Sequence, residues 1–173
     1  MTPSAIGALP LGTLVTSSEN EATVSFALDL YNLLLTPKSF YGRGPSVGPK
    51  LALTDDSTSE RNSLTSTWPT IDLLLCHFHV LQAVWGWLWK GVHGIAKEDR
   101  PPLFNAFKRM VYAKTNDEFS DATAMFNNDT TVKKYPKFSQ HIEKDYMGRT
   151  EQWTMVERIS KKLGTHGNNT TDM

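Results

Sequence analysis

The chain has 173 residues, which is long enough for a domain with a hydrophobic core of its own. Eighteen lysines and arginines balance eighteen aspartates and glutamates, so the formal net charge at pH 7 is zero. A stand-alone nucleic-acid-binding protein usually carries a basic excess that neutralises phosphates. The charge balance therefore argues against a complete DNA-binding protein, and the single cysteine excludes an internal disulfide.

The sequence offers no signal for secretion or membrane insertion. No charged-then-apolar signal peptide is visible at its start. Its most apolar run, residues 73–89, is shorter than the roughly 20 residues of a membrane span, and it contains Cys76, His77, His79 and Gln82. We therefore expect a nuclear or cytoplasmic protein that does not enter a membrane.

The first part of the chain alternates strand-like and helix-like segments. Residues 8–17 are rich in Leu, Val and Thr and predict a strand. Residues 18–36 begin with polar and acidic residues and continue with apolar ones at helical spacing, until Pro37 ends the helix. Residues 41–49 are rich in glycine and proline and predict a loop, and residues 50–54 predict a second, short strand.

The next segments complete the predicted sheet. Residues 57–67 predict a short helix with Thr58 or Ser59 as its N-cap. A third strand is expected over residues 72–76, because three consecutive leucines are too apolar for an exposed edge. From His79 onward the spacing is helical, and this helix would be apolar on almost every side and therefore buried. This alternation predicts a parallel or mixed sheet with helices on its faces.

The second half of the chain predicts helices only. Pro101 and Pro102 would open one helix at its first turn, and further helices are expected over residues 116–128 and 136–162. Residues 164–173 have no apolar residue before the last and are expected to be disordered. The predicted fold class is α/β, followed by an all-helical C-terminal segment.

Asp55 directly follows the second predicted strand. A carboxylate at a strand end in an open sheet points into the crevice where ligands bind, and in two-metal nucleases such carboxylates hold divalent cations. Magnesium prefers one or two carboxylates together with water and phosphate, so a single aspartate is a weak site without partners. The alternative is that Asp55 only ends the strand or caps the following helix.

Cys76 and His79 lie three residues apart, a spacing that suits zinc. Zinc needs three or four protein ligands, and neither a second cysteine nor a suitably spaced histidine completes the set, so zinc is not expected. The alternatives are a buried Cys76 with a hydrogen-bonded His79 at a strand-to-helix turn, or a Cys–His nucleophilic pair that lacks an evident orienting partner.

The tryptophans of the same region could stack on nucleic-acid bases or fill a core. Trp85 and Trp89 share a helix face, whereas Trp87 points nearly opposite. This helical spacing favours the core interpretation, and a base-stacking platform is the alternative.

The order Asp55, Pro69, Cys76 and His79 resembles the second catalytic aspartate and the Cys-x-x-His signature of the MULE (Mutator-like element) transposases. The segments LPLGTLVTS, FYGRGPSVGP, TDDSTSER, LLLCHFHVLQAVWGWLW and KEDRPPLFNAFKRMVYAKT are similar to an animal branch of that family. The resemblance covers most of residues 7–170. It implies an RNase H-like DDE nuclease core that binds transposon DNA and Mg²⁺ and performs DNA cleavage and strand transfer.

The resemblance implies that Asp55 is a catalytic, Mg²⁺-binding residue and that Cys76 and His79 are a family signature. In the family, a first aspartate lies before the segment that matches LPLGTLVTS, and a glutamate lies beyond a motif that matches residues 167–170. Neither carboxylate has a counterpart here, and no SWIM-type zinc motif follows. We therefore expect an internal transposase fragment that is inactive alone and binds DNA weakly or not at all.

The expected organisation is an incomplete RNase H-like core over residues 1–95, a helical segment over residues 96–163 and a tail over residues 164–173. The core would be a remnant of three strands with flanking helices. Two other functions stay open, and the zero net charge favours both over a working DNA enzyme. One is a non-catalytic module that binds DNA or protein, and the other is a decayed element without function.

Overall fold

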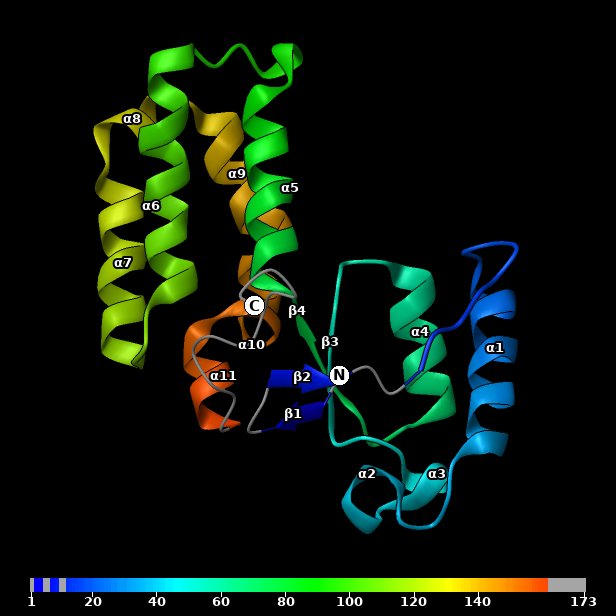
Figure 1. Cartoon of the computed structure of the whole chain (residues 1–173). Helices are drawn as coiled ribbons and strands as arrows, with labels where there is room; N and C mark the ends of the chain where they lie inside the picture. Colours follow the sequence, from blue (N-terminus) through cyan, green and yellow to red (C-terminus); the bar gives the residue numbers. More distant parts are fainter. Residues whose placement is uncertain (1, 5–6, 10–11, 162–173) are drawn as a thin grey trace. The chain divides into compact units, whose positions relative to one another are not determined.

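The computed structural model describes residues 2–4, 7–9 and 12–161, and Figure 1 shows their arrangement. These residues are mostly helical and include a small two-stranded parallel sheet, so the predicted α/β class is confirmed at that level. The chain divides into two compact units, the first ending at Leu74 and the second beginning at Leu75.

The strands of the described residues form two separate pairs. β1 (Thr2–Ser4) pairs antiparallel with β2 (Gly7–Leu9). β3 (Leu51–Thr54) pairs in parallel with β4 (Asp72–Leu75), and α4 (Thr58–Thr67) lies between them in sequence. Because parallel neighbours need such a crossover connection, β3, α4 and β4 form a βαβ unit.

The predicted three-stranded remnant is wrong. Among the described residues of the expected strand over 8–17, residues 8 and 9 belong to β2, residues 12–17 are irregular, and β2 pairs with β1 rather than with β3. Residues with a high strand propensity form a strand only where they can pair with a neighbouring strand and pack one face against other residues. Val15 is instead 91% exposed.

The two long helices of the first unit begin at side-chain caps. α1 (Glu21–Leu34) confirms the predicted helix, and the Oδ1 atom of Asn20 accepts a hydrogen bond from the amide of Thr23 at 2.9 Å. The N-cap of α4 is Ser57, so the predicted caps Thr58 and Ser59 are wrong by one and two residues. These two residues instead belong to the first turn of the helix.

Small polar residues join α1 and α4, which lie side by side in Figure 1. The Ser63 side chain is fully buried and accepts a hydrogen bond from the Ser25 hydroxyl at 3.0 Å. It also donates to the backbone carbonyl of Glu21 at 3.0 Å. These hydrogen bonds satisfy the buried Ser63 hydroxyl between the two helices.

The glycine- and proline-rich segment is not the plain loop that was predicted, because it contains two short helices, α2 (Ser39–Gly42) and α3 (Gly44–Val47). Trp68 packs against this segment, and its indole nitrogen donates to the carbonyl of Pro45 at 2.8 Å. Gly48 has a φ of +72°, and a Cβ at this position would overlap the Trp68 indole. The glycine is therefore required both for the backbone conformation and for the packing of Trp68.

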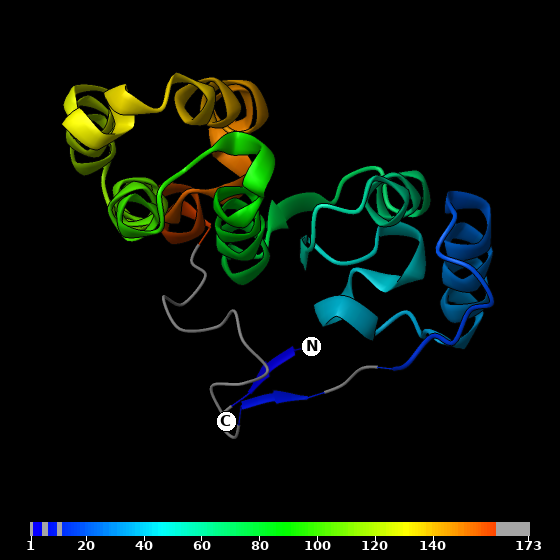
Figure 2. The same ribbon diagram turned by 90° about the horizontal axis from the view of Figure 1, so that it is seen from above.

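The regular structure of the second unit, as far as residue 161, is helical apart from the end of β4, and Figure 2 shows the longer helices end-on. None of the described helices is long and apolar enough to cross a membrane. The helices of the second unit are, in chain order, α5 (His77–Trp89), η1 (Gly91–His93), η2 (Lys97–Asp99), α6 (Arg100–Tyr112), α7 (Asn116–Asn128), α8 (Thr130–Lys134), α9 (Pro136–Asp145), η3 (Met147–Arg149), α10 (Thr150–Trp153) and α11 (Met155–Ser160).

Two of the predicted helices in this unit are confirmed and one is wrong. The helix opened by the two prolines is α6, and α7 has the predicted bounds 116–128. The single helix expected over residues 136–162 is instead divided into α9, η3, α10 and α11. The break begins at Tyr146, whose carbonyl accepts a hydrogen bond from the Trp153 indole at 2.8 Å. The expected disorder of residues 164–173 lies outside the described residues.

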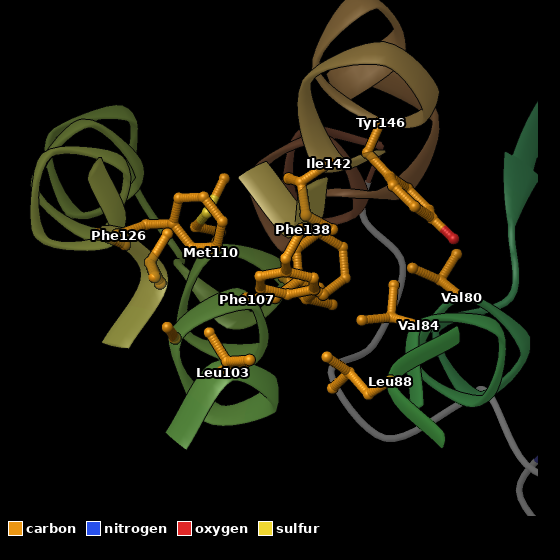
Figure 3. Close-up of a cluster of buried hydrophobic side chains, with 14 of the residues drawn as sticks. Val80, Val84, Leu88, Leu103, Phe107, Met110, Phe126, Phe138, Ile142 and Tyr146 are labelled. Carbon is orange, nitrogen blue, oxygen red and sulfur yellow. The ribbon is translucent and has the colours of Figure 1, made fainter. Parts of the chain in front are cut away.

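One hydrophobic core fills the second unit, and Figure 3 shows much of it. Phe107 of α6 is fully buried, with its ring centroid 5.4 Å from that of Trp153. The prediction that α5 is buried on almost every side is wrong, because Phe78 and Trp89 are about half exposed. Further buried members of the core are Val80, Val84, Leu88, Leu103, Met110, Phe126, Phe138 and Ile142.

Candidate functional site

Asp55 lies one residue beyond β3 and is exposed. Its Oδ1 atom accepts a hydrogen bond from the backbone amide of Ser57 at 2.8 Å. The hydroxyl of Ser57 in turn accepts from the amide of Glu60 at 3.3 Å. Asp55 therefore shapes the turn that leads into α4, which is the capping role that the sequence left open.

Glu60 is the carboxyl group that the structure brings next to Asp55, in the first turn of α4. Burial, the charge of Asp55 and a hydrogen bond between the two side chains raise the pKa of Glu60 to about 7, although Arg61 opposes the shift. A neighbouring carboxylate disfavours the charged form of Glu60, so the Glu60 carboxyl is partly protonated near neutral pH.

Sequence reasoning missed Glu60, although a local signal marks it. The run Ser57-Thr58-Ser59-Glu60 has the form of a capping box, in which the fourth residue usually reaches back to the amide of the first. Here Asp55 accepts from that amide, and the Glu60 side chain bonds to Asp55 instead. An aspartate two residues before a capping box could therefore have indicated that Asp55 and Glu60 form a pair.

Arg61 connects the start of α4 to the end of β3. Its Nη1 atom donates to the hydroxyl of Thr54 at 3.2 Å, and Thr54 is buried. This bond helps to hold the strand end, and with it Asp55, at a defined position beside the first turn of the helix.

The donor set at this strand end fits one divalent cation better than two. Magnesium accepts one or two carboxylates and completes its shell with water and phosphate oxygens, and Asp55 and Glu60 are two adjacent carboxyl groups. A cation would also relieve the repulsion that raises the pKa of Glu60. Within residues 2–4, 7–9 and 12–161, no three His, Cys, Asp or Glu side chains form a group that could hold a metal ion.

Cys76 and His79 belong to the second unit, at the start of α5. Cys76 is half-buried and is the N-cap residue, but its side chain makes no capping hydrogen bond. His79 is exposed, with its ring edge-on to Phe78 at a centroid distance of 5.3 Å. The helix starts at His77, two residues earlier than predicted.

His77 and Arg158 are buried beside this helix start, and sequence reasoning missed both. Arg158 of α11 donates from Nη2 to the carbonyl of Leu75 at the end of β4. Burial, followed by the positive charge of Arg158, lowers the pKa of His77 to about 3. The imidazole is therefore neutral at physiological pH, and its ring packs edge-on against Tyr112 at a centroid distance of 5.5 Å.

A signal for His77 exists in the helical spacing. His77, Val80, Val84 and Leu88 recur at intervals of three and four and form the buried face of α5. Starting the helix at His79 left His77 between the predicted strand and the predicted helix and concealed this pattern. No comparable local signal marks Arg158, because its partner Leu75 is 83 residues away in the sequence.

No protein-family model matches this sequence, and no curated protein matches it. A function for the chain must therefore be argued from its residues and their geometry.

Proposed function

We propose that this chain carries the second-aspartate segment of a MULE-type DDE transposase, whose complete core would be RNase H-like, and that the chain alone is inactive. The observation that carries the proposal is the segment from β3 to α5. Asp55 directly follows β3, and the Cys76-x-x-His79 sequence opens the helix that follows the parallel neighbour β4. The order and spacing of these residues resemble those of the family signature.

The proposal assigns a metal-binding role to the strand end. Asp55 would hold Mg²⁺, and Glu60 would lose its proton to bind the same ion. Bound Mg²⁺ would supply stabilisation of the negative charge on a phosphate oxygen. Two-metal catalysis needs several carboxylates that converge from separate elements. Asp55 and Glu60 lie at the end of one strand and the start of the helix that follows it, so they form a single pair. Transposon DNA would be the partner of the complete enzyme.

A second function, a non-catalytic interaction module, is favoured by a specific observation. The Oδ1 atom of Asp55 already accepts a hydrogen bond from Ser57, so the carboxylate has a structural task without any metal. The zero net charge also fits a protein-binding module better than a DNA enzyme. In this alternative, Asp55 and Glu60 stabilise the start of α4 and do nothing else.

The first test is a nuclease assay on the purified chain. We expect neither nicking nor joining of DNA with Mg²⁺ or Mn²⁺, because one carboxylate pair cannot stabilise both the attacking and the leaving oxygen. Metal-dependent cleavage that disappears in Asp55→Asn would contradict the proposed inactivity. The Asn substitution is suitable because its side-chain oxygen can still accept from Ser57, so the cap is preserved.

The second test extends the chain with its in-frame flanking coding sequence. If that sequence supplies a strand-end aspartate and a helical glutamate, the longer protein should cleave DNA with Mg²⁺. Asp55→Asn should then reduce cleavage by on the order of 10²-fold or more, whereas the matched control Asp56→Asn should retain it. Flanking sequence without these carboxylates, or cleavage that is insensitive to Asp55→Asn, would overturn the transposase proposal and leave the interaction module.

A further inference from the structure

Trp87 lies between two imidazole rings. The His93 ring stacks on one side at a centroid distance of 3.7 Å and an interplanar angle of 13°. The His141 ring stacks at 4.7 Å and 5°. The three rings come from α5, η1 and α9, all within the second unit, so the stack connects three elements.

Different charges surround the two imidazoles. The Nδ1 atom of His141 lies 2.6 Å from the Oδ2 atom of Asp145, a hydrogen bond that becomes an ion pair when the imidazole is protonated, and its ring meets Tyr146 edge-on at 5.7 Å. The charged groups that act on His93 are Lys90, at the end of α5, and Lys137, in the first turn of α9. One histidine therefore has an acidic partner, and the other faces two cations.

We propose that the His93–Trp87–His141 stack is a proton-sensitive clasp. With both imidazoles neutral it holds η1 against α5 and α9, and on acidification His93 leaves the indole while His141 stays. This device is independent of the proposed transposase function, because it uses no residue of the β3–α4 site.

The direction of the response follows from the electrostatics. Burial, then Lys90 and Lys137, lowers the pKa of His93 below its ordinary 6.5. Burial also lowers the pKa of His141, which Asp145 partly restores and which His93 and Lys90 lower further. Because both pKa values are depressed in the folded chain, the clasp is fully stable above pH 6.5 and weakens as the pH falls below it.

The different charged neighbours of His93 and His141 determine which imidazole ring leaves the indole. An imidazolium is attracted to an indole face, but two imidazoliums on opposite faces repel each other. A protonated His141 forms an ion pair with Asp145, which already lies at hydrogen-bond distance. A protonated His93 is repelled by Lys90, by Lys137 and by the second imidazolium.

The test is an NMR pH titration of the full chain. His93→Gln and His141→Gln assign the two imidazole resonances, and Trp87→Phe identifies the ring-current shifts that come from the indole. Both histidines should titrate below pH 6.5, and the ring-current shift should vanish for His93 on protonation but persist for His141.

Two exposed lysines on α9 supply the matched control. Lys137→Gln should raise the pKa of His93 because it removes a repelling charge. Lys144→Gln, two turns further along the same helix, should leave that pKa unchanged. The proposal is overturned if His93 titrates at or above pH 6.5, if its ring-current shift survives protonation, or if the two lysine variants behave alike.

Discussion

Buried titratable groups give the chain its pH dependence at the residue scale. His77 is 3% exposed, and its Nε2 atom has no hydrogen-bond partner among the described residues. Its folded pKa of about 3 lies below the ordinary value of 6.5. The unfolded chain therefore binds one more proton than the folded chain between these two pH values, and stability falls as the pH decreases through this window.

The substitution His77→Gln should make the stability less dependent on pH. Each pH unit between about 6 and 4 should cost the native protein up to about 1.4 kcal/mol through this one group, and glutamine removes that contribution. Urea unfolding of both proteins at several pH values measures the difference. Above pH 6.5 the two free energies of unfolding should differ by a constant, and parallel curves at lower pH would contradict the assignment.

Glu60 acts in the opposite direction. Because its folded pKa, about 7, is raised above the ordinary 4.5, its contribution is present below pH 4.5 and is lost as the pH rises through 7. Glu60 is only partly buried, so solvent screens part of this effect. Asp55→Asn should move the Glu60 pKa back toward its ordinary value, and a carboxyl NMR titration would detect this change. An unaltered Glu60 titration in Asp55→Asn would show that burial alone causes the shift.

At the scale of the element, α4 depends on its N-terminal cap. The Ser57 hydroxyl accepts from the Glu60 amide, so Ser57→Ala should destabilise the protein by about 1 kcal/mol. Ser59→Ala, inside the first turn, should cost little or nothing, because alanine has the higher helix propensity. Thermal unfolding of both variants measures the difference. Equal losses, or a greater loss in Ser59→Ala, would show that the cap lies where the sequence alone placed it.

The hydrophobic core of the second unit governs stability at the scale of the whole molecule. Phe107 is fully buried against Trp153 and Tyr146, so Phe107→Ala should cost about 3 to 5 kcal/mol. Met125 of α7 is 61% exposed, so Met125→Ala is the matched control and should change stability by less than about 0.5 kcal/mol. Chemical denaturation gives both values, and a small loss in Phe107→Ala would contradict the described core.

The sequence by itself determined the elements whose signals are local. The first-turn prolines of α6, the period of α7, the polar start of α1 before Glu21 and the leucine-rich strand β4 each depend on a few neighbouring residues, and the structure has them where the sequence predicts them. The position of Asp55 at the end of β3 could also be predicted from the sequence, because a strand followed by a capping turn has a clear local pattern.

The tertiary structure alone decided what depends on distant partners. It limited the first predicted strand to β2, divided the helix expected over residues 136–162, and paired Arg158 with Leu75. It also placed His93 and His141 on opposite faces of Trp87. Each outcome depends on packing between residues far apart in the chain, and local propensity carries no information about such contacts.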